Sequence, residues 1–157
     1  MSAPARSPFE GGRSPHPLDL AWLRLGRDWA WLAIVPAEPG LDVSLLARAL
    51  ARVGEEVSQE QVEFRDASRV EPGGVPGLVT DLRREKRGGR AVVALSCPLS
   101  SAAALEVARS ADGVVLCTRR GQTPLAGVRA AAAAIGKAKL VCSLLIDEGP
   151  PAPMRRR

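Results

Sequence analysis

Residues 33–54 read Ala-Ile-Val-Pro-Ala-Glu-Pro-Gly-Leu-Asp-Val-Ser-Leu-Leu-Ala-Arg-Ala-Leu-Ala-Arg-Val-Gly, and this stretch decides the fold. It continues an apolar run, 29–35, whose lack of polar alternation predicts a strand buried on both faces, as in a parallel sheet. The turn at 37–40 contains Pro and Gly, and Asp42 is placed to cap a helix that Gly54 ends. A strand, a tight loop and an amphipathic helix in this order predict the first unit of an α/β domain.

Further strands and helices alternate along the rest of the chain. Buried strands are expected at 91–96, 114–118 and 140–146, and a weaker strand with one exposed face is expected within 57–65. Helices are expected at 18–25, at 78–82 before a basic run, at 100–111 and at 124–135, and a loop is expected at 72–76. This alternation predicts an α/β fold, with one parallel sheet that carries helices on both faces. The strands expected to be parallel neighbours, with the loop 37–44 at their carboxyl edge, are 29–35, 91–96, 114–118 and 140–146.

The length of 157 residues accommodates one domain with a buried core. We expect this domain to span 18–147. Residues 1–17 are rich in Pro, Gly and Ser, and such a segment buries too little apolar surface to offset its ordering entropy, so we expect a disordered N-terminal tail. Three prolines end the fold and leave a Pro/Arg tail at 148–157.

Composition argues against several classes of protein. The chain is 46% hydrophobic and 25% charged, which is ordinary for a soluble globule, and no apolar run approaches the ~18–20 residues that a spanning helix needs. The three cysteines lack CxxC spacing and the only histidine, His16, lies in the expected tail, so we predict a cytoplasmic protein without a metal site. The basic run 83–90 lacks interleaved aromatic residues, which favours a solvated helix end over a nucleic-acid surface.

The opening stretch resembles the Walker A region of the MinD/ParA ATPases and the bacterial tyrosine kinases, which are polysaccharide co-polymerase kinases. That family has a strand, then Ser-x-Glu-Pro-Gly-Glu-Gly-Lys-Ser/Thr, then an Ala-rich helix that ends in Gly. The residues that match this pattern are Glu38, Pro39, Gly40 and Ser44. Asp42 stands where the family has the last loop glycine, and Val43 stands where it has the lysine.

Three later stretches resemble the same family in the same order. Residues 90–112 are similar to a strand that ends in Asp-Thr-Pro-Pro and a helix that leads to Ala-Asp-Gly-Val, but Ser96 replaces the aspartate. Residues 120–123 resemble the Ala-Gly-x-Thr turn of the tyrosine kinases, and 144–147 resemble a strand that ends in an adenine-contacting Asn, which is substituted here. The resemblance covers roughly 18–147. It is weakest over 55–89, where we find no counterpart of the family's aspartate motif after the second strand.

The resemblance implies a P-loop fold that has lost its ATP machinery. In a P-loop, backbone N–H groups and a helix N-terminus converge on phosphate, a lysine neutralises its charge and a Ser/Thr hydroxyl holds Mg²⁺. Val43 removes the cation, at a cost of roughly 1.5–3 kcal/mol, and Asp42 places a negative charge where the phosphates would lie. Ser96 removes Mg²⁺ support. Because micromolar ATP binding requires about 8 kcal/mol, we predict no nucleotide cofactor, no metal and no catalytic residues.

The sequence therefore predicts a catalytically inactive interaction or regulatory module. The resemblance to the tyrosine kinases implies a role in exopolysaccharide or capsule polymerisation and export, with an inner-membrane polymerisation protein as the partner. The alternative is a MinD/ParA-like positioning or assembly partner of an active ATPase of the same fold. An enzyme is the least supported class, because Cys97 at the carboxyl edge would need a nearby His to become a nucleophile.

A partner surface is expected where two predicted loops meet. We expect a protein to dock at 37–44 and 119–123, because mixed charges steer and register a partner. The interaction residues predicted in these loops are Glu38, Asp42, Arg119 and Arg120.

Overall fold

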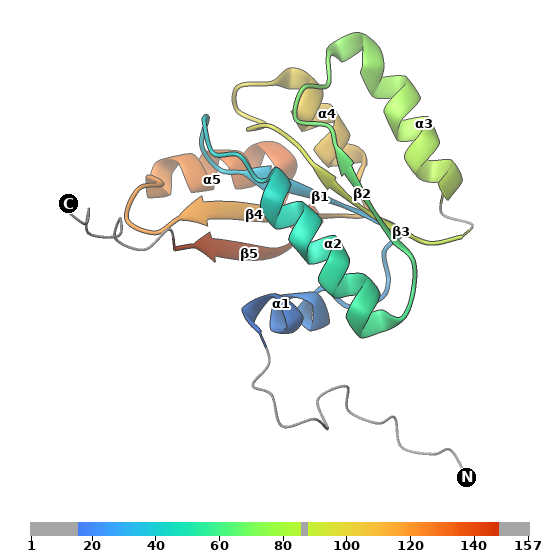
Figure 1. Cartoon of the computed structure of the whole chain (residues 1–157). Coiled ribbons are helices and arrows are strands. Elements are labelled where there is room, and N and C mark those ends of the chain that lie inside the picture. The colour runs from blue at the N-terminus through green and yellow to red at the C-terminus, as the bar shows by residue number, and fades with distance from the viewer. Residues whose placement is uncertain (1–15, 86–87, 148–157) are drawn as a thin grey trace, which may run out of the picture.

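The computed structural model describes residues 16–85 and 88–147 of the chain (Figure 1). Within these residues, five parallel strands form one sheet in the order β2-β3-β1-β4-β5. The strands are β1 (Trp31–Pro36), β2 (Val62–Asp66), β3 (Arg90–Ala94), β4 (Gly113–Arg119) and β5 (Leu140–Ile146). The four strands that were expected to be parallel neighbours correspond to β3, β1, β4 and β5, so the prediction of a parallel α/β sheet is confirmed.

Helices cover both faces of this sheet (Figure 1). One face carries α1 (Pro17–Leu25) and α2 (Ser44–Ser58), and the other carries α3 (Val75–Glu85), α4 (Ala102–Ser110) and α5 (Leu125–Ile135). Short 3₁₀ turns occupy Pro72–Gly74 and Lys137–Lys139. The helices that the structure describes fall short of the length and apolar character that crossing a bilayer requires.

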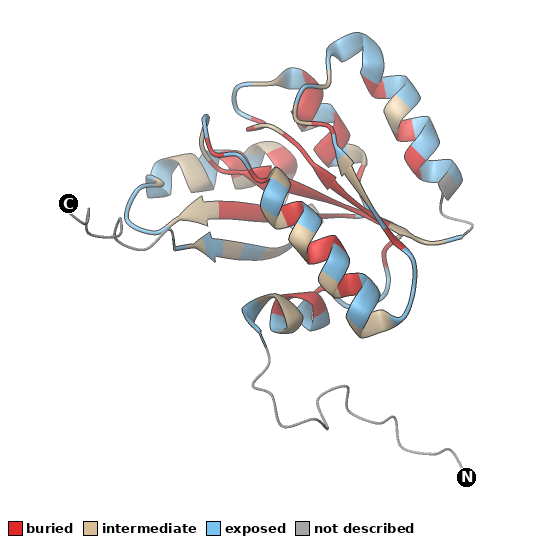
Figure 2. Cartoon of the chain, viewed as in Figure 1, coloured by how far each residue is buried: buried red, intermediate tan, exposed pale blue. Residues whose placement is uncertain are grey.

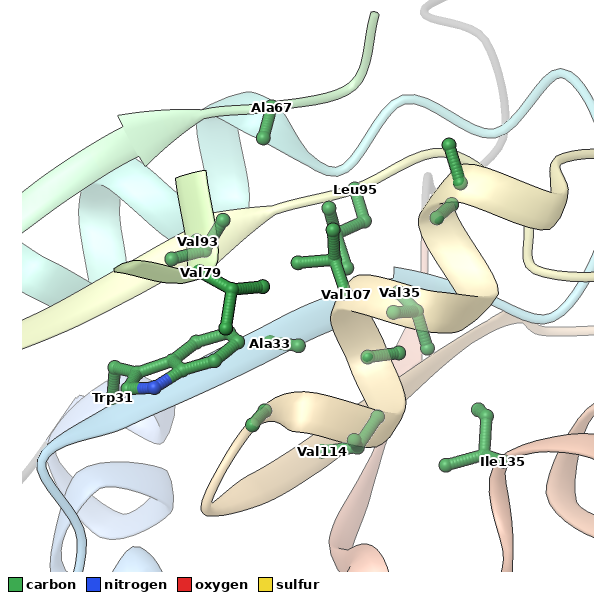
Figure 3. Packing of buried hydrophobic residues seen from close by; sticks show 14 of the residues in the cluster. Trp31, Ala33, Val35, Ala67, Val79, Val93, Leu95, Val107, Val114 and Ile135 are labelled. Carbon is green, nitrogen blue, oxygen red and sulfur yellow. The ribbon is translucent and has the colours of Figure 1, made fainter. Parts of the chain in front are cut away.

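Strand β1 supplies side chains to two separate hydrophobic cores. Trp31, Ala33 and Val35 pack toward α3, α4 and α5, whereas Leu32 and Ile34 pack toward α1 and α2, and all five are fully buried. Figure 3 shows the first of these cores, with the Trp31 indole at one end of it. The buried indole N–H finds no hydrogen-bond acceptor among the described residues. The apolar run 29–35 was therefore interpreted correctly as a strand covered on both sides, although the strand begins at Trp31 and ends at Pro36.

The first helix begins earlier than the sequence predicted. His16 is the N-cap of α1, because its Nδ1 accepts a hydrogen bond from the Leu18 N–H at 3.2 Å, and the His16 N–H donates to Asp19 Oδ2 at 2.8 Å. Pro17 is the first helical residue, where its missing N–H costs no intrahelical hydrogen bond. These two residues thus belong to the domain and not to a disordered tail. The rest of the predicted tails, 1–15 and 148–157, lies outside the described residues.

The middle of the chain is more helical than the sequence predicted. The expected loop at 72–76 is a 3₁₀ turn followed directly by α3, and Pro76 fits inside the first turn of that helix for the reason given for Pro17. The strand expected within 57–65 is β2, which starts later and ends at Asp66. Residues 57 and 58 belong instead to the last turn of α2.

Gly54 does not end α2, as the sequence predicted, but lies inside it. The helix continues to Ser58, and Gly54 is buried beneath the ring of Trp22 from α1. A Cβ atom at this position would lie 2.4 Å from Trp22 Cη2. Glycine is required here because two helices approach closely, and this reason is invisible in a local sequence pattern.

Asp112 joins the start of β4 to the start of β1. Its Oδ2 accepts hydrogen bonds from the Ala30 N–H at 2.8 Å and from the Trp31 N–H at 3.1 Å. The Ala-Asp-Gly-Val sequence around it therefore has a structural role in this fold, since the carboxylate satisfies two amides at the amino end of the central strand.

Replacing Asp112 by Ala is expected to lower the free energy of unfolding by about 1–3 kcal/mol, because two amides lose a charged acceptor. Asp112→Asn is the matched control, since its side-chain carbonyl retains one acceptor, and it should lose less. Urea unfolding monitored by circular dichroism measures both changes. Equal stability of Asp112→Ala and the parent protein would contradict this role.

Gly54→Ala should destabilise the protein by about 1–3 kcal/mol, although alanine favours helices, because the new methyl group collides with Trp22. In a Trp22→Ala background the same substitution should instead stabilise by up to about 1 kcal/mol, since the collision is gone and only helix propensity remains. Thermal and urea unfolding of the four proteins of this cycle test the reversal of sign. A Gly54→Ala effect with the same sign in both backgrounds would rule out the Trp22 contact as its cause.

Candidate functional site

The loops at the carboxyl ends of the strands form the candidate site. The helix that follows β1 lies on one face of the sheet, whereas the helices that follow its neighbours β3 and β4 lie on the other face. The loops therefore diverge around the end of β1, which is where ligands bind in open α/β sheets. We call the loops 37–43, 95–101 and 119–124 the carboxyl-edge site.

The loop 37–43 packs its apolar side chains into the core. The Ala37 N–H donates to the Cys117 carbonyl at 2.9 Å, which extends the pairing of β1 with β4 by one residue. Gly40 has a φ of 84°, in the region that favours glycine. After this turn, Leu41 and Val43 are 8% and 1% exposed within the core beneath α2. The position that corresponds to the family's lysine therefore carries a buried apolar side chain.

Asp42 occupies the start of α2 with its own carboxylate. Its Oδ1 accepts a hydrogen bond from the Ser44 N–H at 2.8 Å and another from the Ser44 hydroxyl. The hydroxyl, and then the amide, hold the pKa of the Asp42 carboxyl below its usual value. The predicted cap is corrected in one respect, because Val43 is the N-cap residue and Asp42 precedes it. Asp42 nevertheless satisfies an amide of the first helical turn, which otherwise lacks an intrahelical partner.

Glu38 and Arg119 connect two loops of the carboxyl-edge site. Arg119 Nε lies 2.7 Å from Glu38 Oε1, and both side chains are mostly buried. The Arg119 N–H also donates to Thr123 Oγ1 at 2.7 Å, which closes the turn after β4. Arg120 pairs elsewhere, with Asp147 Oδ2 at 3.3 Å, and this ion pair is exposed.

The structure thus divides the four predicted interaction residues into separate contacts. Glu38 and Arg119 form an ion pair, Arg120 pairs with Asp147 at the end of β5, and Asp42 bonds to Ser44. All four residues lie at one edge of the sheet, as predicted. The charges of Glu38 and Arg119 largely neutralise each other, because the two side chains form an ion pair. Asp42 and Arg120 are the exposed members of the set.

Asp66 is a residue that the sequence analysis missed. It is the last residue of β2, and its Oδ1 accepts from the Ser68 N–H at 3.0 Å, as Asp42 does from Ser44. The Ser68 hydroxyl and amide lower the pKa of Asp66, whereas burial and the neighbouring Asp42 carboxylate act in the opposite direction. The Asp-x-Ser spacing at 66–68 was the available signal, but the expected strand stopped at 65.

The loop after β3 is closed by its own hydrogen bonds. The Cys97 carbonyl accepts from the N–H groups of Ser100 and Ser101 and from the Ser100 hydroxyl, each at 3.1 Å. Cys97 is 2% exposed, so its thiol is shielded from solvent. Ser96, which stands in place of the family's aspartate, is half-buried. Among residues 16–85 and 88–147, no three His, Cys, Asp or Glu side chains gather as metal ligands would.

Three exposed leucines lie where helices begin beside the carboxyl-edge site. Leu45, Leu99 and Leu125 are 78%, 45% and 62% exposed, and they belong to the start of α2, the loop before α4 and the start of α5. Single exposed leucines are common on protein surfaces, whereas leucines that form one continuous patch are typical of a contact surface. Sequence analysis missed them because a leucine at the start of a helix gives no signal of exposure.

A pocket of about 600 Å³ lies at the opposite, amino-terminal edge of the sheet. Its main cation, Arg90, lies over the Trp29 ring at 4.8 Å from the centroid and forms an ion pair with Glu60 at 3.2 Å. Asp112, which also lines the pocket, holds the start of β1. These groups are engaged in joining the strand ends, so the carboxyl edge is the better candidate for function.

Comparisons with known proteins agree with the fold. Comparison of the sequence with models of protein families and with curated proteins finds no match. Comparison of the structure with solved structures finds the BceF tyrosine kinase domain, with a TM-score of 0.55 and 13% sequence identity over 85% of this chain and 74% of that chain. At this identity the similarity concerns the fold alone, and this chain has a fold similar to that of a tyrosine kinase domain.

Proposed function

We propose that this chain is a catalytically inactive relative of the P-loop kinase domains and serves as a cytoplasmic interaction or regulatory module. The observation that carries the proposal is the hydrogen bond from the Ser44 amide to the Asp42 carboxylate at 2.8 Å. In a P-loop the amides at the start of this helix bind phosphate. Here one of them is bound by a negative group of the protein itself, which also repels phosphate.

The surroundings of Asp42 support the same proposal. A lysine that reaches phosphate must extend from the loop, whereas Val43 is buried in the core between α2 and the sheet. No cation of the loop replaces it, because Arg119 is held by Glu38 at 2.7 Å. Asp66 lies at the carboxyl end of β2, on the same edge of the sheet, and Arg69 offsets part of its charge. The carboxylate of Asp42 therefore makes the start of α2 unfavourable for a nucleoside triphosphate.

The exposed groups of the carboxyl edge support binding of a protein. Leu45, Leu99 and Leu125 offer apolar contact area, and Asp42 and Arg120 offer charges of both signs. Apolar contacts surrounded by mixed charge are the usual composition of a protein interface, in which charges set orientation more than affinity. The partner therefore docks at 37–44 and 119–123 and covers the leucines beside these loops.

The pathway is proposed from similarity. The fold is similar to that of a tyrosine kinase domain, and the Glu-Pro-Gly loop resembles that of the polysaccharide co-polymerase kinases. We place the module in exopolysaccharide or capsule polymerisation and export, in contact with an inner-membrane polymerisation protein. Capture of an active ATPase of the same fold would instead support a positioning or assembly role.

Calorimetric titration of the protein with ATP and Mg²⁺ is expected to give no heat of binding in the micromolar range, which corresponds to about 8 kcal/mol. Asp42→Asn keeps an acceptor for the Ser44 amide without the charge, and it should also fail to bind, because the lysine is still missing. An active P-loop kinase domain serves as the positive control. Micromolar binding by the parent protein would refute the inactive-loop proposal.

Reversing the two exposed charges, with Asp42→Lys and Arg120→Glu together, should reduce partner capture from the native cell extract. The melting temperature should change by only a few degrees, since exposed charges contribute about 0–1 kcal/mol each. The matched control reverses one acid and one arginine midway along helices, with Glu106→Lys and Arg52→Glu, and should leave capture unchanged. Equal recovery of the partner by both folded double variants, measured by mass spectrometry, would locate the interface elsewhere.

A further inference from the structure

The two edges of the sheet differ in how they are protected. The edge strand β2 carries three charged residues among its five, and Glu63 and Arg65 form an ion pair at 2.9 Å. Charged side chains on an edge strand discourage pairing with another chain. The other edge strand, β5, reads Leu-Val-Cys-Ser-Leu-Leu-Ile and contains neither a charge nor a proline over seven residues. The β2 edge is therefore protected against pairing with another chain, whereas the β5 edge is not.

Strand β5 is also less covered than the strand beside it. Residues 113–117 of β4 are buried, whereas β5 alternates between half-buried and exposed residues (Figure 2). Val141 and Leu145 are 41% and 63% exposed. Apolar side chains on a long, open edge strand are characteristic of a pairing surface.

The backbone of β5 offers free hydrogen-bonding groups along this edge. The Ile146 carbonyl accepts from the Arg120 N–H at 2.9 Å, so the polar groups of Ile146 face β4. Because successive residues of a strand direct their N–H and C=O groups to opposite sides, those of Ser143 and Leu145 point away from β4. No strand of the described chain lies beyond them.

The charges at the two ends of β5 favour a second copy as its partner. Lys137 and Lys139 precede the strand, and Lys139 Nζ donates to the Ala111 carbonyl at 2.8 Å. Asp147 follows the strand and forms an exposed ion pair with Arg120 at 3.3 Å. In an antiparallel pair of two β5 strands, the two lysines of each strand lie beside Asp147 of the other. The chain's own continuation is a poor occupant, because Pro150, Pro151 and Pro153 lack the N–H groups that a ladder requires.

We propose that β5 is a dimerisation edge, on which β5 of a second copy of this chain pairs antiparallel about a two-fold axis near Ser143. The two sheets then join into one continuous sheet of ten strands. Pairing stops at the dimer, because the only sheet edges left in the described chains are the charged β2 strands. This edge adjoins the loop 119–123, because Arg120 contacts Ile146 and Asp147 at the end of β5. The proposed pairing uses the backbone of β5 itself, so the proposal does not depend on the proposed function.

Sedimentation velocity of the full chain over a concentration series tests the proposal. A species of about 33 kDa, twice the 16.5 kDa of the chain, should appear as concentration rises. Ser143→Pro removes one outward N–H and should abolish this species, whereas the matched variant Ser143→Ala keeps the N–H and should retain it. If Ser143→Pro loses its circular dichroism signal, Leu145→Lys gives the same test by placing a charge on the edge.

Three results would overturn the proposal. These are a monomer at every concentration up to the millimolar range, a dimer that survives Leu145→Lys and folded Ser143→Pro, and open-ended assembly beyond the dimer. Leu45→Lys is the control for the carboxyl edge and should leave the dimer intact. Loss of the dimer in Leu45→Lys alone would assign self-association to the loops and refute a role for β5. Partner capture by the β5 variants should be unchanged, which separates this test from that of the proposed function.

Discussion

Strand β1 directs alternate side chains into two hydrophobic cores, while its backbone pairs with β3 and β4. The positions of the remaining helices and strands depend on these two requirements. A strand without a solvent face must have helices above and below it, because its apolar side chains otherwise remain in water. Trp31, Ala33 and Val35 require the layer of α3, α4 and α5, and Leu32 and Ile34 require that of α1 and α2. The divergence of loops at the end of β1 follows directly, since the helix after β1 and the helices after its neighbours leave in opposite directions.

In P-loop folds, phosphate binds where the loops diverge in this way. In this chain, side chains of the protein itself occupy the corresponding position at the start of α2. Asp42 bonds to the first amide of α2, Val43 enters the core, and Glu38 holds Arg119. Each of these contacts stabilises the loop in the absence of a ligand. A loop that is held by its own contacts needs no nucleotide to order it.

The two edge strands of the sheet differ in polarity, since β2 is charged and β5 is largely apolar. This difference determines which edge can pair with another chain. The charges on β2 satisfy the usual requirement that an edge strand discourage pairing, whereas β5 presents apolar residues and unpaired backbone groups. Because an unprotected edge exposes a protein to aggregation, such a strand is tolerated where something covers it. In the proposed dimer, β5 of a second copy supplies that cover.

The sequence by itself determined the parallel α/β fold, since the apolar runs at 29–35, 91–96, 114–118 and 140–146 and the Ala-rich helices between them leave few other arrangements. It also predicted the position of the loop 37–44 at the carboxyl edge. Only the tertiary structure decided that Gly54 lies inside α2 under Trp22, and that Arg119 rather than Arg120 pairs with Glu38. Periodicity and turn chemistry act over a few neighbouring residues, so they predict elements and their ends. Contacts between residues that are distant in the chain depend on how the helices pack against the sheet, and no local pattern contains that information.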